Sequence, residues 1–236
     1  MQILRTDLSG CAQARGAVVV IDVLRSFTTA AFALAGGALE VVAVASLDAA
    51  RALRASDRGA LVLGAVGGGA AAPGVDMGNS PAQVAARDLT GRRVIQCTAG
   101  GTRGLHACAG AELLLAGSLV CAAATAAYLR ALAPPSVVLV VTGGWADRDG
   151  DEDHACADLI EALLRGRDPP RAPYAARVRA SDFGRRFSAG SDPNLPAADL
   201  DCCADVDRFA FALPVRREAD GLVLRAVAPR RQRPPP

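Results

Sequence analysis

Short, continuously apolar runs alternate with longer segments of helical spacing along the first 165 residues. Runs that are apolar at every position are typical of strands covered on both faces of a sheet. The predicted strands are Ala17–Val23, Leu39–Ala45, Ala60–Gly64, Arg93–Cys97, Glu112–Ala116 and Val137–Thr142. The predicted helices are Ser26–Ala35, Leu47–Ser56, Pro81–Arg87, Thr102–Ala109, Leu119–Ala131 and Asp151–Arg165. This alternation predicts an α/β fold with a mostly parallel, mixed central sheet.

The pattern is weaker beyond this region, where a charged, proline-containing linker occupies residues 166–173. We expect helices at Ala175–Phe187 and Leu195–Ala204, then an antiparallel pair of strands at Phe209–Pro214 and Leu222–Ala228. The chain is therefore expected to form a single domain over residues 1–236. Its core would be residues 1–165, residues 174–228 would pack on that core, and the Arg- and Pro-rich tail 229–236 would be disordered or extended.

Composition supports a globular protein and excludes several classes. The 236 residues are 51% hydrophobic and 21% charged, with a net charge of +2, and no basic block is interleaved with aromatic residues, so we expect no nucleic-acid partner. The longest apolar stretch, Leu113–Leu129, is interrupted by Gly117 and Ser118, which favours a strand, turn and helix over a membrane span. Without a secretion signal pattern, the expectation is a soluble, cytoplasmic protein with no membrane partner.

The seven cysteines are odd in number and irregularly spaced, and no CxxC pair occurs. A zinc site is therefore not expected. Several cysteines lie in apolar runs, where a free thiol behaves as a small hydrophobic side chain, and this indicates a reducing compartment.

Polar side chains gather where the predicted strands end. Asp22 follows the first strand, and Asn79 and Ser80 close the loop after the third. Thr98–Arg103, Ser118 and the Glu152–Asp153 pair follow the later strands. Because the carboxyl ends of parallel strands share one rim of the sheet, we expect these loops to form a ligand site.

The turn Thr98–Arg103 joins a strand to a helix and contains Gly100 and Gly101. Glycines at such a turn allow backbone N–H groups to converge on an anion at the helix N-terminus, with Thr and Arg side chains as further donors. A tight turn with glycines for close packing explains the same residues, and the sequence leaves both interpretations open.

Three carboxylates stand out: Asp22 at the end of an apolar strand, and Glu152 with Asp153 at the start of a helix. A buried carboxylate is unfavourable unless it is paired, solvated or bound to a metal. Arg25 could pair with Asp22, and the other two could simply favour the helix dipole. Taken together, the three offer the hard oxygen ligands that Mg²⁺ prefers.

Five motifs occur in an order that resembles the 2-phosphosulfolactate phosphatase family over residues 17–165. They read VVVIDVLRSFTTAAFALAGGA, DMGNSP, TAGGTRGL, GSLVCAAATAAYL and EDHACADLI. The resemblance implies a three-layer α/β/α fold and a Mg²⁺-dependent hydrolase that converts 2-phospho-3-sulfolactate to sulfolactate and phosphate. In methanogens that step belongs to coenzyme M biosynthesis. A homodimer is expected for an enzyme of this size.

The resemblance also selects candidate residues by their place in the motifs. The candidate catalytic and metal-binding residues are Asp22, Glu152 and Asp153. The candidate substrate-binding residues are Arg25, Thr28, Thr29, Asn79, Ser80, Thr98, Gly100, Gly101, Thr102, Arg103 and Ser118.

The chain departs from the family pattern at two positions. Members usually carry an acidic residue before the glycine pair after the third strand, whereas this stretch reads Gly64-Ala65-Val66-Gly67-Gly68. The third motif commonly reads TNGT, and here Ala99-Gly100 stands in place of the Asn. These losses leave two alternatives: a phosphatase for a different small phosphorylated acid, or a degenerate anion-binding domain without catalysis.

A cysteine mechanism is a further alternative, because Cys97 and Arg103 have the C-x5-R spacing of cysteine phosphatases. Cys202 and Arg208 share that spacing, which is expected by chance in so Arg-rich a chain, and Gln96 stands where such enzymes carry His. The haloacid dehalogenase mechanism is excluded, since position 24, where it needs a second Asp, is Leu24.

Overall fold

The computed structural model describes residues 1–65 and 69–229. Its strands form a nine-stranded sheet in the order β1-β7-β2-β6-β8-β9-β3-β5-β4. The strands are β1 (Gln2–Asp7), β2 (Gly16–Ile21), β3 (Glu40–Ala43), β4 (Leu61–Gly64), β5 (Arg93–Cys97), β6 (Ala111–Gly117), β7 (Ser136–Val141), β8 (Leu213–Glu218) and β9 (Gly221–Leu224). All six predicted core strands and the antiparallel closing pair are confirmed. The sequence pattern did not indicate β1, because it mixes polar and apolar positions.

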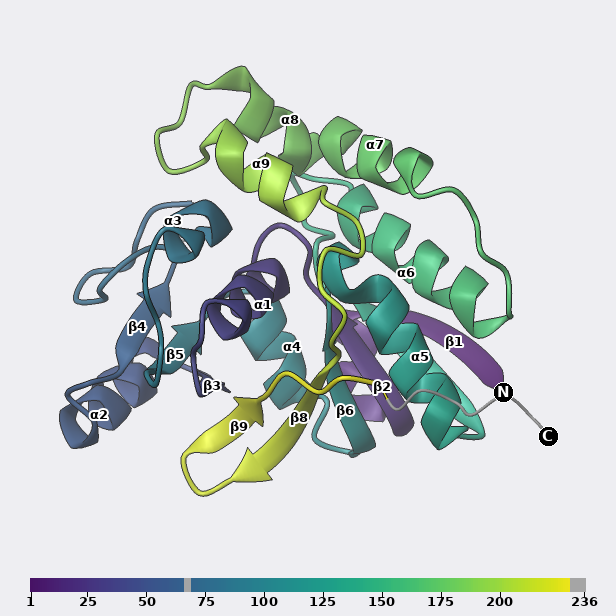
Figure 1. Cartoon of the computed structure of the whole chain (residues 1–236), viewed down its shortest axis with the longest axis horizontal. Helices are drawn as coiled ribbons and strands as arrows, with labels where there is room; N and C mark the ends of the chain where they lie inside the picture. Colours follow the sequence, from purple (N-terminus) through teal and green to yellow (C-terminus); the bar gives the residue numbers. More distant parts are fainter. Residues whose placement is uncertain (66–68, 230–236) are drawn as a thin grey trace.

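The sheet consists of two parallel groups joined by a hairpin. Strands β1, β7, β2 and β6 are parallel to one another, as are β3, β5 and β4. The β8–β9 hairpin lies between the groups and pairs antiparallel with β6 and with β3. The two groups therefore run in opposite senses along the ladder, and Figure 1 shows them on either side of α1 (Ser26–Ala35). We expected the loops to share one rim of a single parallel sheet. They lie instead where the two parallel groups meet.

The remaining helices are α2 (Leu47–Ser56), α3 (Pro81–Ala85), α4 (Gly101–Ala107), α5 (Ala122–Leu132), α6 (Asp151–Leu164), α7 (Ala172–Ala180), α8 (Asp182–Ala189) and α9 (Ala197–Cys203). Short 3-10 turns span Leu8–Gln13 and Leu119–Cys121. The predicted helix at Ala175–Phe187 is in fact two helices. Ser181 separates them, because its hydroxyl accepts a hydrogen bond from Gly184 N at 3.0 Å and so begins α8.

Strand β2 lies between two apolar cores, which confirms the three-layer α/β/α arrangement. Val18 and Val20 pack into the core that contains α1 and α4, whereas Val19 and Ile21 pack into the core that contains α5 and α6. Successive side chains of a strand point to opposite faces, so a strand covered by helices on both faces must be apolar throughout.

The C-terminal helices cover one end of this core. Helix α7 packs on α6, and α9 packs on α3 and α8, so these three C-terminal helices lie together at one end of the molecule, opposite the β8–β9 hairpin (Figure 1). The predicted tail lies outside the described residues except for Pro229. In the described part of the chain, no helix combines the length and apolarity that a membrane span requires.

Candidate active site

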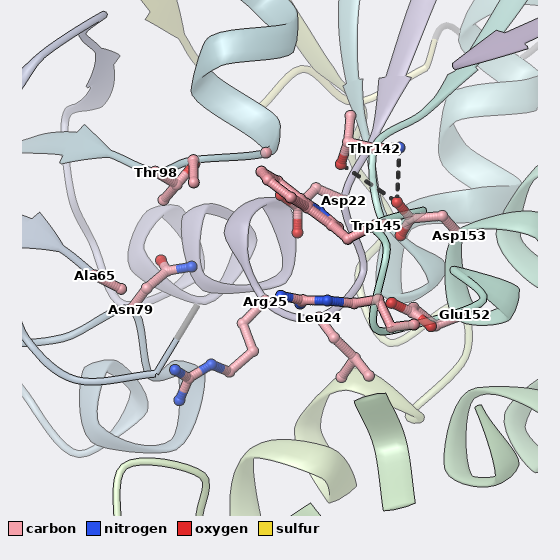
Figure 2. Close-up of a pocket in the computed structure, with 14 residues that line it drawn as sticks. Asp22, Leu24, Arg25, Ala65, Asn79, Thr98, Thr142, Trp145, Glu152 and Asp153 are labelled. Carbon is pink, nitrogen blue, oxygen red and sulfur yellow. Dashed lines mark hydrogen bonds between the residues drawn. The ribbon is translucent and has the colours of Figure 1, made fainter. Parts of the chain in front are cut away.

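The loops at the strand ends converge on a cavity of about 340 Å³ between the two parallel groups. The predicted site residues that line it are Asp22, Arg25, Asn79, Thr98, Gly100, Glu152 and Asp153. Figure 2 shows Glu152 and Asp153 on one side, Arg25, Asn79 and Thr98 on the other, and Asp22 between them. The expected spatial convergence is therefore present for these seven.

The Asp22 carboxylate joins the two halves of the site. Its Oδ1 accepts a hydrogen bond from Ser26 N at 2.9 Å, and its Oδ2 accepts one from Gly101 N at 2.7 Å. These two amides begin α1 and α4, which follow strands of different parallel groups. Burial raises the pKa of Asp22, although both backbone hydrogen bonds and the positive charge of Arg148 oppose that shift.

Asp153 is held in the same way at the start of α6. Its Oδ1 accepts a hydrogen bond from Val23 N at 2.8 Å and its Oδ2 one from Thr142 N at 3.0 Å. Burial and the nearby charges of Asp22 and Glu152 raise the pKa of Asp153 well above its usual value. The backbone amides thus fix the Asp153 carboxylate in place, but they do not remove the cost of burying its negative charge beside Asp22 and Glu152.

Glu152 is 1% exposed, and burial raises the pKa of its carboxyl to about 7. Its Oε2 has no hydrogen-bond partner among residues 1–65 and 69–229. A buried acceptor without a partner is destabilising and calls for an explanation, such as a bound ion.

Two glycines keep the backbone clear of these oxygens. A Cβ on Gly143 would lie 2.8 Å from Glu152 Oε1 and 3.2 Å from Asp153 Oδ2. A Cβ on Gly100 would lie 2.8 Å from Asp22 Oδ2. Any larger residue at either position would crowd the carboxylates. Close packing alone therefore explains why glycine occupies positions 100 and 143.

The donor chemistry of this cluster fits Mg²⁺, which takes oxygen ligands. Across the two described ranges, no group of three or more His, Cys, Asp or Glu side chains has an arrangement that could hold a metal ion. A hydrated Mg²⁺ needs only one or two protein carboxylates and fills its other positions with water and substrate oxygens. The carboxylates and the unpaired Glu152 Oε2 therefore suit a partly hydrated ion rather than an all-protein cage.

Arg25 pairs with Asp199 of α9, so the suggested pairing with Asp22 is wrong. Its Nη1 lies 2.5 Å from Asp199 Oδ2, and the two side chains are 1% and 0% exposed. Asp199 Oδ1 also accepts a hydrogen bond from Ser80 Oγ at 2.6 Å. Ser80 also caps α3, because its hydroxyl accepts a hydrogen bond from Gln83 N at 3.2 Å. It does not line the cavity itself and instead holds Asp199, the partner of Arg25.

Thr28, Thr29 and Ser118 are buried and bonded inside the protein rather than exposed to the cavity. Thr28 Oγ1 donates to Val23 O at 2.8 Å and lies 2.6 Å from Ser118 Oγ. Thr29 Oγ1 donates to Arg25 O at 2.9 Å. These hydroxyls brace the loop that carries Asp22.

The glycine-rich turn after β5 is only partly directed at the cavity. Thr98 and Gly100 line it. Thr102 is buried, and its hydroxyl donates to Thr98 O at 2.9 Å. The Gly101 amide already serves Asp22, so on this side the turn holds a protein carboxylate rather than a free anion.

Arg103 is exposed on α4 and does not line the cavity. Burial raises the pKa of the Cys97 thiol, which disfavours the thiolate that a cysteine nucleophile requires. The C-x5-R spacing therefore does not correspond to a cysteine phosphatase loop in this fold.

Sequence reasoning missed Arg148, which lines the cavity from the loop between β7 and α6. Its guanidinium lies 4.2 Å from the ring centroid of Phe183 in α8, and its side chain is only 12% exposed. The only sign of Arg148 in the sequence was its position, close to Trp145 in the loop between a strand end and the Glu152–Asp153 pair. Its contact with Phe183 could not be predicted, because Phe183 belongs to a segment distant in sequence.

Comparison with known proteins agrees with this architecture. The family model for 2-phosphosulpholactate phosphatase matches residues 4–216. A probable 2-phosphosulfolactate phosphatase of Deinococcus radiodurans is 35% identical over 227 residues, covering 93% of each chain. Another, from Prochlorococcus marinus strain MIT 9313, is 34% identical over 222 residues and covers 85% of this chain and 88% of that protein. A third, from Bacillus subtilis, is 28% identical over 203 residues.

The family match extends the resemblance seen in the five motifs to residues 4–216, which include the C-terminal helices α7, α8 and α9. The chain belongs to the 2-phosphosulfolactate phosphatase family.

Proposed function

We propose that this protein is a Mg²⁺-dependent phosphatase that hydrolyses 2-phospho-3-sulfolactate to sulfolactate and phosphate. The observation that supports this most is the polarised cavity, in which Asp22, Glu152 and Asp153 face Arg25 and Asn79 (Figure 2). A cavity of about 340 Å³ suits a small molecule. The choice of 2-phospho-3-sulfolactate as the substrate rests on the names of the family and of the relatives.

The acidic side of the cavity would hold the cation. Burial raises the pKa of all three carboxyls, and the charge of Asp22 adds to the rise at Glu152 and Asp153. A divalent cation bound beside them would offset this penalty. When bound, Mg²⁺ would polarise a phosphoryl oxygen. In the metal-free protein Glu152, with a pKa of about 7, is suited to hold or release a proton near neutral pH, and a bound cation would favour its ionised form.

Two cavity arginines would orient the anionic groups of the substrate: Arg25 opposite the acidic side, and Arg148, whose charge acts on Asp22. Arg25 is fixed by Asp199, and Arg148 is fixed against Phe183, so neither guanidinium needs to be ordered when substrate binds. The substrate carries a carboxylate and a sulfonate besides its phosphate, and guanidinium groups bind such anions well.

Three further expectations stay predictions: a cytoplasmic location, a homodimer, and a place in coenzyme M biosynthesis. A phosphatase acting on a different small phosphorylated acid is the second candidate, because the acidic residue usual in the family is missing near Ala65, which lines the cavity.

The purified protein should release phosphate from 2-phospho-3-sulfolactate in the presence of Mg²⁺, and chelation should abolish turnover. Phosphate release is measured against phospholactate and a simple alkyl phosphate. A preference for phospholactate would support the second candidate. Phosphate binding without turnover of any ester would support the degenerate, anion-binding alternative and contradict the proposal.

Replacing Asp22 with Asn should lower kcat by about 100- to 1000-fold, the typical effect of losing one transition-state interaction. The melting temperature should also fall, because an Asn amide offers one acceptor in place of the two oxygens that accept hydrogen bonds from Ser26 N and Gly101 N. The control is Asp48→Asn, at a side chain that is 91% exposed on α2. Near-normal activity in a destabilised Asp22→Asn protein would assign Asp22 a structural role only.

The stability of the metal-free protein should depend on pH through Glu152. Its pKa rises from 4.5 unfolded to about 7 folded, so its contribution is fully present below pH 4.5 and is lost as pH rises through 7. That loss amounts to roughly 3 kcal/mol of unfolding free energy. Denaturant unfolding with a chelator, compared between wild type and Glu152→Gln, isolates it. Parallel pH profiles for the two proteins would show that Glu152 does not titrate in this way.

A further inference from the structure

Gln96 is a fully buried polar side chain near the end of β5, in register with Ala43 of β3 and Leu63 of β4. Its Nε2 donates to Ser26 O at 2.9 Å and to Asn79 Oδ1 at 2.8 Å. Its Oε1 has no hydrogen-bond partner among the residues that the structure describes. An apolar side chain would avoid that unpaired acceptor, so the amide calls for a reason beyond packing.

These contacts fix the orientation of two amides. Ser26 O is a backbone carbonyl and can only accept, so the Gln96 group that faces it must be the NH2. The same NH2 lies 2.8 Å from Asn79, so the Asn79 atom that faces it must be the carbonyl oxygen.

The Asn79 NH2 must then point away from Gln96. Figure 2 shows its nitrogen on the side of the amide that faces Asp22, with the oxygen turned away. Asn79 lines the cavity, and no hydrogen bond joins this nitrogen to another residue within 1–65 or 69–229. It is therefore a donor presented to whatever occupies the cavity.

We propose that Gln96 is a positioning residue that holds Asn79 with its NH2 towards an anionic oxygen of the ligand. The proposal deepens the phosphatase assignment and rests on it only in taking the ligand to be an anion. Turned over, the Asn79 amide would present its carbonyl to that anion and repel it. Gln96 thus decides whether this part of the wall attracts or repels negative charge.

The test measures the dissociation constant of inorganic phosphate by calorimetry in Mg²⁺, together with kcat and KM. Gln96→Met removes the donor and leaves Asn79 free to rotate, so phosphate affinity should fall about three- to tenfold. Asn79→Ala should weaken binding about tenfold or more, the value of one hydrogen bond to a charged group. In the Asn79→Ala background, Gln96→Met should have no further effect.

Additive losses in the double variant would overturn the proposal, since they would mean that Gln96 acts through Ser26 or through packing. Unchanged phosphate affinity in folded Gln96→Met would do the same.

Asn79→Asp keeps the proposal testable if Gln96→Met fails to fold. One carboxylate oxygen can still accept from Gln96, so the fold should be retained, while the other faces the cavity and should weaken phosphate binding at least tenfold. Wild-type affinity in Asn79→Asp would overturn the proposal.

The outcome is separable from that of the proposed function. A wild-type protein that binds phosphate in this cavity but hydrolyses no ester would contradict the phosphatase assignment and leave the role of Gln96 standing. A wild-type protein that binds no phosphate would overturn the role of Gln96 as well.

Discussion

The Asp22 carboxylate is the interaction on which the site depends. It accepts the amides of Ser26 and Gly101, which begin the helices that follow β2 and β5. Those strands belong to parallel groups that run in opposite senses along the sheet. In a flat sheet their carboxyl ends would lie at opposite edges, yet residues that follow both strands line the same cavity. One buried acidic side chain thus closes the junction in which the cavity lies.

This closure has an electrostatic consequence. Asp22 is joined by Asp153 and Glu152, and each of the three has a raised pKa because burial disfavours its charged form. Backbone amides and the charge of Arg148 offset part of that penalty. A site that keeps like charges together out of water is suited to a cation and a phosphate ester, and such clusters of perturbed carboxyls are typical of active sites. The stability sacrificed there is a common feature of functional sites.

Much of the fold was predictable because it follows from local pattern. The bounds of α1 and α2 were predicted to the residue, and all six buried strands were found from continuous apolar runs. The convergence of Asp22 with Glu152 and Asp153 followed from their places at strand ends. The opposite directions of the two strand groups could not be predicted, because they depend on the β8–β9 hairpin far along the chain. Arg103 was wrongly expected in the site, because the sequence does not show which face of α4 is turned to solvent.

The site residues that escaped prediction share one property: their partners are remote in sequence. Asp199 matters because it meets Arg25, and Gln96 matters because it meets Asn79. An Asp in a short helix and a Gln at the end of an apolar strand carry no local sign of such pairing. The most direct test of the account is a crystal structure with Mg²⁺ and sulfolactate. We predict a cation about 2.1 Å from oxygens of the Asp22–Asp153–Glu152 cluster and the anion against Arg25 and Asn79; ligands bound elsewhere, with this cavity holding only water, would contradict it.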